Sequence, residues 1–506
     1  MKHIISVDAG TTASKISIFN EHGQLLAKST HEYSLITPSP LEVEISADTL
    51  WRAFAAGVSD VLQKTGIGIQ DVVAIGISAQ GETLIPVGSD GKPLRNAIVW
   101  LDNRAQEEAK TLNKRFNDGT SYKITGQVKI VPTWPASKIL WIKRNEADLF
   151  KKVHKYLLVE DYLIYRMTGK VVAEGSLLCS TVYWDITKKK WWHEMLQYLD
   201  ISEDQLPEIR ESGEVIGELL PEAAQELGLS RNTTVCTGAL DQAAGAVGVG
   251  NIKPGIFSEN TGAALAICAT LEKPVFDPKL RMPIHYHALP DRYMAHTFTT
   301  GGMVLRWFRD NFSQQEMNVA QAMGKDPYDL IGTEATRVPP GCEGLVMLPH
   351  LQGAMAPEAD PNAKGVFFGF TLHHTRAHFA RAIMEAIACI IRRNIEVLED
   401  LKIQVKEIRS LGGGARSSVW GQIKADVTNR PVLVATIEDA ACLGAALLAG
   451  TALGMFKSLQ DACQKTVTIG GRFQPIPANA KAYDSTFRAY VELYNSLKAL
   501  FENTGS

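Results

Sequence analysis

Short apolar runs alternate along the chain with longer segments in which apolar residues recur at helical spacing. In the first half, the runs predict strands at 3–7, 15–19, 24–29 and 72–78, and the helical spacing predicts a helix at 47–65. Runs of four to eight apolar residues are typical of buried strands, whereas recurrence every three to four residues indicates a helix. The alternation predicts an α/β fold whose sheet opens with antiparallel strands.

The second half of the chain repeats this order of elements. We expect strands at 255–258 and 264–269 around a turn at 259–263, a long helix at 376–401 and a strand at 408–411. A strand, a Thr-Gly turn and a second strand thus occur near residue 10 and again near residue 261. This repetition indicates two related halves.

The boundary between the halves is expected in the Gly-rich stretch 245–254, which ends in Lys-Pro-Gly. Such stretches connect elements, and 506 residues suffice for two or three domains. We therefore predict an N-terminal domain at 1–250 and a C-terminal domain at 251–506. The weakly polar run 440–456 is interrupted by glycines and is too short to span a membrane, which favours a buried helix packed closely on a neighbour.

Charge and cysteine content exclude several classes of protein. Lys and Arg total 52, Asp and Glu total 55, and the net charge is −3, which argues against nucleic acid or a membrane surface as a partner. Seven cysteines without a C-x-x-C pair, and an N-terminal apolar run too short for a signal peptide, predict reduced thiols in a cytoplasmic protein. The sequence leaves open whether the chain forms a homodimer.

The polar segment after the first strand, residues 8–15, has the composition of a phosphate-binding turn. Gly10 would let backbone N–H groups approach an anion, and two threonines and Lys15 add donors. Asp8, at the end of a buried strand, would hold Mg²⁺ through water, because Mg²⁺ prefers oxygen ligands. The alternative is a polar hairpin turn.

One carboxylate, Asp241, lies among small residues after a strand expected at 234–237. Desolvation raises the pKa of a carboxyl group, which then accepts a proton from a substrate hydroxyl. The alternative is that Asp241 caps a helix beginning near Gln242. Taken alone, this segment favours the cap.

The glycine-rich segment 412–418 lies between a predicted strand and a helical pattern. Glycines at a strand end permit a flat ligand to lie on the backbone, and the following helix N-terminus favours phosphate. The alternative is a tight turn between a strand and a helix.

A fourth polar group follows the strand at 72–78. Carboxylates and amides beside an aromatic face suit ligands with several hydroxyl groups, because each hydroxyl both donates and accepts. We therefore expect substrate contacts from Gln80, Glu82, Trp100, Asp102 and Arg104. The alternatives are a local ion pair for the last two residues and core packing for the tryptophan.

Other common motifs are absent from the sequence. It contains no G-x-x-x-x-G-K-S/T, no G-x-G-x-x-G between a strand and a helix, and no H-E-x-x-H. His373-His374 is expected in a solvated loop rather than a metal site, and the lysines at 188–190 in a solvated turn.

In this order, the segments resemble the FGGY family of carbohydrate kinases. The resemblance covers about residues 3–455 and rests on 8–15, 135–145 with its Lys-x-x-Trp, 238–242, 365–385 and 412–418. It implies ATP-dependent phosphorylation of a sugar or polyol hydroxyl by two ribonuclease-H-like domains, as in actin and hexokinase, with the active site in the cleft between them.

The resemblance also implies roles for individual residues. Asp241 would be the general base, Gln242 would contact the substrate, and Asp8 would lie near Mg²⁺. The residues that would line the ATP site are Gly10, Thr11, Thr12, Lys15, Thr261, Gly262, Gly302, Arg306, Gly413, Gly414 and Ser418.

The substrate pocket combines features of several branches of the family. Gln80-Gly81-Glu82-Thr83 replaces the Gln-Met-His-Gly of xylulose kinases and is closer to the Gln-Arg-Glu-Thr of glycerol kinases, whereas residues 100–104 favour the pentulose or gluconate branch. Our leading hypothesis is a kinase for a ketopentose such as xylulose. The alternatives are a kinase for glycerol, a tetritol or an aldonate such as gluconate, and a non-catalytic regulator of the same fold.

Overall fold

The computed structural model describes residues 2–504, which form two compact units. The first unit comprises the chain up to Ile252, with Glu272–Met294 and Ile437–Val467; the second comprises Lys253–Leu271, Ala295–Thr436 and the chain from Thr468 onward. The sequence suggests one boundary near residue 250. In the structure, the chain first passes from one unit to the other near this residue. Two later segments, 272–294 and 437–467, belong to the first unit again.

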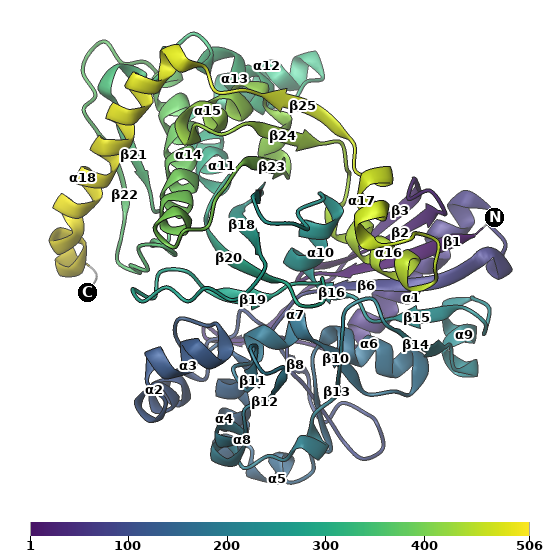
Figure 1. The fold of residues 1–506 in the computed structure, drawn as a ribbon. Helices are drawn as coiled ribbons and strands as arrows, with labels where there is room; N and C mark the ends of the chain where they lie inside the picture. Colours follow the sequence, from purple (N-terminus) through teal and green to yellow (C-terminus); the bar gives the residue numbers. More distant parts are fainter. Residues whose placement is uncertain (1, 505–506) are drawn as a thin grey trace. The chain divides into compact units, whose positions relative to one another are not determined.

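A mixed sheet lies at the centre of the first unit (Figure 1). Its strand order is β14-β15-β6-β1-β2-β3, and β16 also pairs with β6. The bounds are β1 His3–Ala9, β2 Ala13–Asn20, β3 Leu25–Glu32, β6 Val72–Ala79, β14 Val215–Glu218, β15 Thr234–Cys236 and β16 Ala239–Leu240. β1 runs antiparallel to β2 and parallel to β6, which confirms the predicted antiparallel opening.

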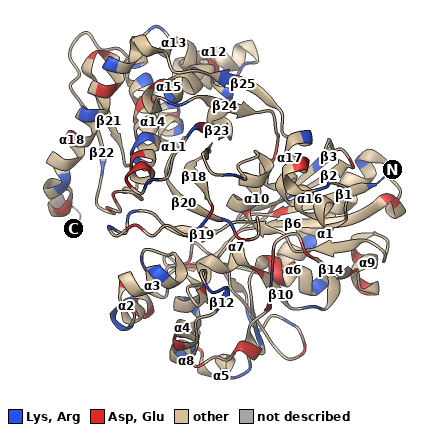
Figure 2. Cartoon of the chain, viewed as in Figure 1, with Lys and Arg blue, Asp and Glu red and all other residues tan. Residues whose placement is uncertain are grey.

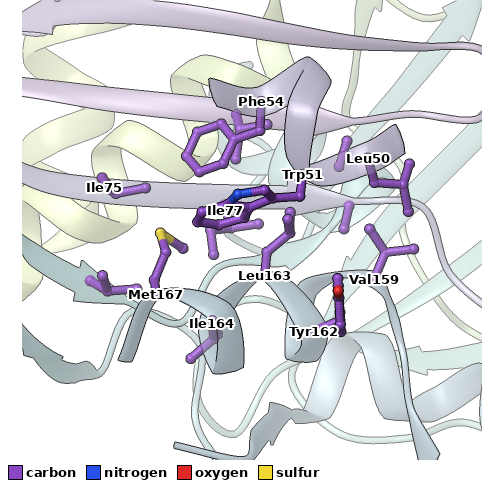
Figure 3. Packing of buried hydrophobic residues seen from close by; sticks show 14 of the residues in the cluster. Leu50, Trp51, Phe54, Ile75, Ile77, Val159, Tyr162, Leu163, Ile164 and Met167 are labelled. Carbon is purple, nitrogen blue, oxygen red and sulfur yellow. The ribbon is translucent and has the colours of Figure 1, made fainter. Parts of the chain in front are cut away.

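One face of this sheet packs on α1 (Ala47–Thr65) and α6 (Val159–Thr168). Successive strand residues point to opposite faces, and Ile75 and Ile77 of β6 both point to this one. Figure 3 shows them beside Trp51 of α1 and the apolar side chains of α6. The bounds of α1 coincide with the predicted helix.

The opposite face of the sheet packs on α10 (Asp241–Gly248) and α16 (Ala440–Ala452). Here the elements approach closely enough to require glycine. A Cβ on Gly76 of β6 would lie 2.3 Å from a backbone oxygen of α16, and a Cβ on Gly444 would lie 1.9 Å from one of α10. The prediction of a buried, closely packed helix within 440–456 is therefore confirmed.

The second unit repeats the central strand order of the first. Its sheet contains β20-β18-β17-β23-β24-β25, with bounds β17 Ile256–Thr261, β18 Ala264–Leu271, β20 Tyr293–Thr300, β23 Glu407–Leu411, β24 Val432–Ala435 and β25 Ile469–Phe473. In both units a central strand pairs antiparallel with the next strand in sequence and parallel with a later one. The turn predicted at 259–263 is wrong in part, because β17 continues to Thr261.

Helices of the second unit pack mainly around α14 (Arg376–Asp400), which contacts α15 (Ser418–Thr428) and α13 (Pro327–Ala335). The further elements of this unit are α11 Met303–Phe312, α12 Gln314–Met323, β21 Val346–Pro349, β22 Gly365–Phe368 and α18 Ala480–Thr504. The helix predicted at 376–401 is thus confirmed.

The remaining elements belong to the first unit. They are β4 Ile36–Ser39, β5 Glu42–Ile45, β7 Ile85–Val87, β8 Ala97–Ile98, α2 Gln106–Arg115, α3 Asp118–Thr125, α4 Pro135–Asn145, α5 Ala147–Phe150, β9 Lys155–Leu157, β10 Val172–Glu174, α7 Gly175–Leu178, β11 Trp184–Asp185, β12 Lys190–Trp191, α8 His193–Leu199, β13 Glu208–Arg210, α9 Pro221–Leu227, β19 Ile284–Tyr286 and α17 Leu459–Thr466.

Charged residues of both signs are distributed over the elements of each unit (Figure 2). This matches the near-neutral composition. Within residues 2–504, no helix is long and apolar enough to cross a bilayer. The seven cysteine side chains are all buried.

Candidate active site

Polar side chains of the first unit gather where the parallel strands β1, β6 and β16 end. The register places Asp8 of β1 beside Ser78 of β6, and Ser78 beside Ala239 of β16. Asp241 begins α10 two residues later. Ligands of α/β proteins commonly bind outside the carboxyl ends of parallel strands. The sheet therefore brings the two predicted acidic residues to the same edge.

Asp8 shares its nearest cation with a second carboxylate. Its Oδ1 accepts a hydrogen bond from Ser78 Oγ at 2.9 Å, and its Oδ2 lies 3.3 Å from Lys15 Nζ. The same Nζ lies 3.1 Å from Asp439 Oδ2. Burial and the charge of Asp439 raise the pKa of Asp8, although Lys15 opposes them. One lysine facing two carboxylates leaves negative charge uncompensated.

Asp241 lies close enough to Asp8 for their charges to interact. Burial, and next the charge of Asp8, raise the pKa of Asp241 to about 7, although the Gln242 N–H donates to its Oδ1 at 2.7 Å. The helix-cap interpretation is wrong in detail, because Leu240 is the N-cap and Asp241 is the first residue of α10. A carboxyl group with this pKa is suited to accept a proton near neutral pH.

Buried acidic residues that belong to no short sequence motif hold the backbone before Asp241. Glu160 Oε1 accepts the Gly238 N–H at 2.7 Å, and Ser176 Oγ accepts the Leu240 N–H at 3.0 Å. The Ser176 hydroxyl in turn donates to Glu174 at 2.8 Å. The only available signal was adjacent acidic residues, Glu160 and Asp161, in an otherwise apolar segment.

The turn between β1 and β2 is fixed by side chains from other segments. The Gly10 carbonyl accepts hydrogen bonds from Gln80 Nε2 at 2.9 Å and from the Tyr33 hydroxyl at 2.6 Å. Trp100 Nε1 donates to Thr11 Oγ1 at 2.7 Å. Gln80 and Trp100, predicted as substrate ligands, therefore also support this turn.

Glu82 and Lys138 form a second polar cluster. Glu82 has a left-handed backbone (φ 56°), and burial raises the pKa of its carboxyl although Ser180 donates a hydrogen bond to it. Lys138 of α4 is fully buried, and its Nζ donates to the carbonyls of Glu82 at 2.8 Å and Val99 at 3.0 Å. Burial lowers the pKa of Lys138 to about 7. The Lys-x-x-Trp motif thus contributes the lysine that fixes the backbone at Glu82.

Asp102 and Arg104 form a buried ion pair, as their alternative interpretation predicts. Arg104 Nη2 lies 2.8 Å from Asp102 Oδ2 and 2.8 Å from Glu44 Oε1. Asp102 is fully buried and its Oδ2 also accepts the Val43 N–H at 2.6 Å. The Arg104 guanidinium lies over the Trp141 ring, 4.9 Å from its centroid. This geometry favours a supporting role for the pair, while direct substrate contact stays a prediction.

A compensated carboxylate, Glu259 of β17, lies beside the second Thr-Gly turn. Lys424 Nζ lies 2.6 Å from Glu259 Oε1, and both side chains have 0% exposure. Thr261 Oγ1 donates to Glu259 and lies 3.0 Å from Lys424 Nζ. Ser410 Oγ also donates to Glu259. The Thr261 hydroxyl, predicted to face nucleotide, is therefore part of a buried network.

Gly262 and Gly302 bring this turn against the start of α11. The Gly302 N–H donates to the Gly262 carbonyl at 2.8 Å, and a Cβ on Gly302 would lie 2.5 Å from that oxygen. Arg306 follows on α11 with 69% exposure of its side chain, 3.6 Å from Asp310. In the first unit, the predicted ligand Thr12 is likewise exposed.

The glycines that follow β23 differ in what surrounds them. A Cβ on Gly414 would lie 2.7 Å from Thr261 Cβ, so Gly414 permits close packing. A Cβ on Gly413 would meet no atom within 4 Å, which leaves this backbone accessible. Ser418 begins α15 and borders a cavity of about 620 Å³ that residues 336–340 also line. A cavity of this volume suits a nucleoside.

Comparisons with known proteins show the family of the chain. Residues 3–248 match the N-terminal domain, and residues 261–453 the C-terminal domain, of the FGGY family of carbohydrate kinases. The chain is 31% identical over 501 residues to the xylulose kinase of Bacillus subtilis (strain 168), covering 99% of this chain and 98% of that protein. It is also 31% identical over 504 residues to the gluconokinase of the same organism, covering 99% and 96%.

A solved structure is similar over the whole chain. The ligand-bound xylulose kinase from Lactobacillus acidophilus has a TM-score of 0.91 and 29% identity, covering 99% of this chain and 100% of that chain. The chain therefore belongs to the FGGY family of carbohydrate kinases, with its two-domain, actin- and hexokinase-like ATPase fold, and is a phosphotransferase enzyme.

Proposed function

We propose that the enzyme transfers the γ-phosphoryl group of ATP to a hydroxyl of an uncharged ketopentose such as xylulose. The observation that carries this proposal is the carboxyl group of Asp241. Its pKa is raised to about 7, and it lies at the strand edge that also holds Asp8.

Asp241 would act as the general base. As the acceptor hydroxyl oxygen attacks the γ-phosphorus, its proton passes to the Asp241 carboxylate and ADP leaves. Phosphoryl transfer depends chiefly on positioning and charge stabilisation. The hydrogen bonds from the Gly238 and Leu240 N–H groups fix the backbone that positions Asp241.

Asp8 would hold the Mg²⁺ of Mg-ATP, through water. The donors near it are carboxylate oxygens and one hydroxyl, which suit this ion. Asp8 and Asp439 share a single lysine, so a divalent cation would offset the second negative charge. Burial, and next the charge of Asp439, raise the pKa of Asp8. When bound, the ion would neutralise charge on the phosphates.

The second unit would hold the nucleotide. Gly413 offers an accessible backbone, and the cavity beside Ser418 has the volume for adenosine. Within the second unit, we propose that the phosphates contact Thr261 and Gly262 of the turn, Gly302 and Arg306 at the start of α11, and Gly414 after β23. For the first unit, we propose that Gly10, Thr11, Thr12 and Lys15 form a phosphate-binding turn.

The charges of the first unit favour an uncharged acceptor. An aldonate would bring its own carboxylate to a site where Asp8 and Glu82 already raise the pKa of Asp241. Like charges in a partly buried site repel. The substrate hydroxyls would instead bind Gln80, Glu82, Trp100 and Gln242. The equal identity to a gluconokinase makes gluconate the specific second candidate.

A coupled assay of ADP release tests this proposal with xylulose, ribulose, glycerol, erythritol and gluconate as acceptors. Asp241→Asn serves as the control for acceptor-independent ATP hydrolysis. We expect kcat/KM for a ketopentose at least about tenfold above that for gluconate, a difference of about 1.4 kcal/mol. A higher kcat/KM for gluconate, glycerol or erythritol than for the ketopentoses would identify that compound as the substrate instead. No acceptor-dependent ADP from a wider sugar panel would instead support the non-catalytic alternative.

A further inference from the structure

Three side chains of the second unit that can bind a metal ion converge, and none of them is among the residues assigned above. Glu343 Oε2 lies 2.8 Å from His373 Nε2 and 3.1 Å from His378 Nε2. All three atoms lie within 4.8 Å of one another. The residues come from separate segments: the turn before β21, the loop after β22 and the first turn of α14. We propose that they form a binding site for Zn²⁺ or a similar divalent first-row transition ion.

The backbone of the turn directs Glu343 toward the two imidazoles. Cys342 and Glu343 both have left-handed conformations, with φ of 47° and 51°, and Gly344 follows with φ 94°. Consecutive left-handed residues other than glycine are uncommon, and such strain gathers at functional sites. His378 is fixed from the other side, because it is the third residue of α14 and has only 9% side-chain exposure.

The distances suit a tetrahedral ion after a small displacement. Zn²⁺ binds imidazole nitrogen and carboxylate oxygen at about 2.0–2.2 Å, so neighbouring ligand atoms lie about 3.3 Å apart. The contacts of 2.8 and 3.1 Å are hydrogen bonds that an ion would widen by about half an ångström or less. His373 adjusts easily because its side chain is 72% exposed. The fourth position would be open to water.

Neighbouring groups are placed to orient the ligands. In the structure, His378 Nδ1 accepts the Thr375 N–H at 3.1 Å. When Nε2 binds the ion, the ring proton would lie on Nδ1, which would then donate to Thr375 Oγ1, 3.0 Å away, in place of that contact. His374 would act as a positioning residue, because its Nε2 lies 3.1 Å from the Cys342 carbonyl and its Nδ1 accepts the Thr371 N–H at 2.9 Å. Such partners fix the orientation of metal-binding imidazoles.

The donor set distinguishes this site from the carboxylates of the first unit. Two imidazoles and one carboxylate select Zn²⁺, Co²⁺, Ni²⁺ or Cu²⁺, whereas oxygen donors alone suit Mg²⁺. A bound ion would join three segments and stabilise the N-terminal end of α14.

Metal titration of the full-length enzyme tests the proposal. After chelator treatment, Co²⁺ should give visible d–d absorption that saturates at one ion per chain and that Zn²⁺ abolishes. His373→Ala and Glu343→Gln should each weaken binding at least about tenfold. Zn²⁺ should raise the Tm of the unsubstituted enzyme and not that of either variant.

His193→Ala is the matched control, because His193 is also exposed and also faces a single glutamate, Glu203, at 3.4 Å. It should leave Co²⁺ binding unchanged. Absence of saturable binding, or binding that survives both His373→Ala and Glu343→Gln, would overturn the proposal. Loss of binding only in the control variant would overturn it as well. Both substitutions change partly exposed side chains, and circular dichroism confirms that the variants are folded.

Discussion

The two units have similar turns at similar points of similar sheets, yet the acidic residue beside the turn has a different charge environment in each. β1 and β17 each pair antiparallel with the next strand and parallel with a later one. In the first unit, Asp8 and Asp439 share Lys15, whose side chain is 48% exposed. In the second, Glu259 has its own lysine, Lys424, and both are fully buried.

This difference indicates a chemical role for the carboxylate of the first unit and a structural role for that of the second. A carboxylate without a full counter-charge keeps a raised pKa and can exchange protons or bind a cation. A buried carboxylate with a lysine and two hydroxyl donors is neutralised and fixed in place. The repeated fold therefore provides one turn suited to catalysis and one that stabilises the surrounding backbone.

Substitution of Asp241 should have the largest effect on activity and a small effect on folding. Asp241→Asn removes the proton acceptor but keeps the shape, so kcat should fall about 10²–10⁴-fold, as for loss of a general base. Acceptor-dependent ADP release measures kcat, and ATP binding should be retained. Asp200→Asn, at an exposed carboxylate of the same unit, should have normal kcat. Comparable turnover in the two variants would reject Asp241 as the base.

Removal of Lys424 should chiefly reduce stability, whereas substitution of Asp241 chiefly reduces activity. Lys424→Met leaves Glu259 buried without its cation, which costs about 3–5 kcal/mol of unfolding free energy. Lys15→Met should cost less, because the Lys15 side chain is 48% exposed and a carboxyl group with a raised pKa can take up a proton instead. Urea unfolding of both variants measures the difference.

The double variant Glu259→Gln/Lys424→Met should recover part of that loss, because no isolated charge remains. If Lys424→Met and Lys15→Met were equally stable, the contrast between a compensated and an uncompensated turn would fail.

The elements were predictable from sequence because their signals are local. The helix Ala47–Thr65 has the predicted bounds, since apolar spacing and the following glycine act within one segment. The end of β17 was mispredicted for a physical reason. The sequence around Glu259 is typical of a polar turn, and its partner in the strand, Lys424, lies 165 residues later.

In the candidate site too, residues in local motifs were predictable and residues that act through distant contacts were not. Asp8, Asp241 and the glycines were identified because turn residues form short motifs. Glu160, Ser176 and Tyr33 were missed, since their roles depend on which backbone groups the fold brings near them. His373 and His378 likewise acquire a common partner only when the turn at Glu343 is placed beside α14.

The uncompensated carboxylate should reduce stability above neutral pH. The pKa of Asp241 is raised to about 7 in the folded state, against about 3.9 for an unfolded aspartate. The folded state therefore holds the extra proton between these values, and stability falls as the pH rises through this window. Asp241→Asn, which cannot ionise, should be more stable than the unsubstituted enzyme at pH 8 by about 1–2 kcal/mol, with allowance for the partial exposure of the side chain.

Urea unfolding at pH 5, 6, 7 and 8 measures this dependence. The advantage of Asp241→Asn should shrink steadily toward pH 5 and vanish near pH 4. If the stability advantage of Asp241→Asn did not change with pH, the pKa of Asp241 would not be raised in the folded state. The contrast between the two turns would then be weaker.

The glycines of the second unit should give the smallest effect on folding and separate packing from ligand access. Gly413→Ala adds a Cβ that meets no atom within 4 Å, so unfolding free energy should change by about 0.5 kcal/mol or less. Because this backbone is the proposed surface for ATP, KM for ATP should rise several-fold with little change in KM for the sugar. Gly414→Ala places its Cβ 2.7 Å from Thr261 Cβ, and its free energy of unfolding should fall by about 1–3 kcal/mol. If Gly413→Ala bound ATP normally, the accessible glycine would not mark the nucleotide site.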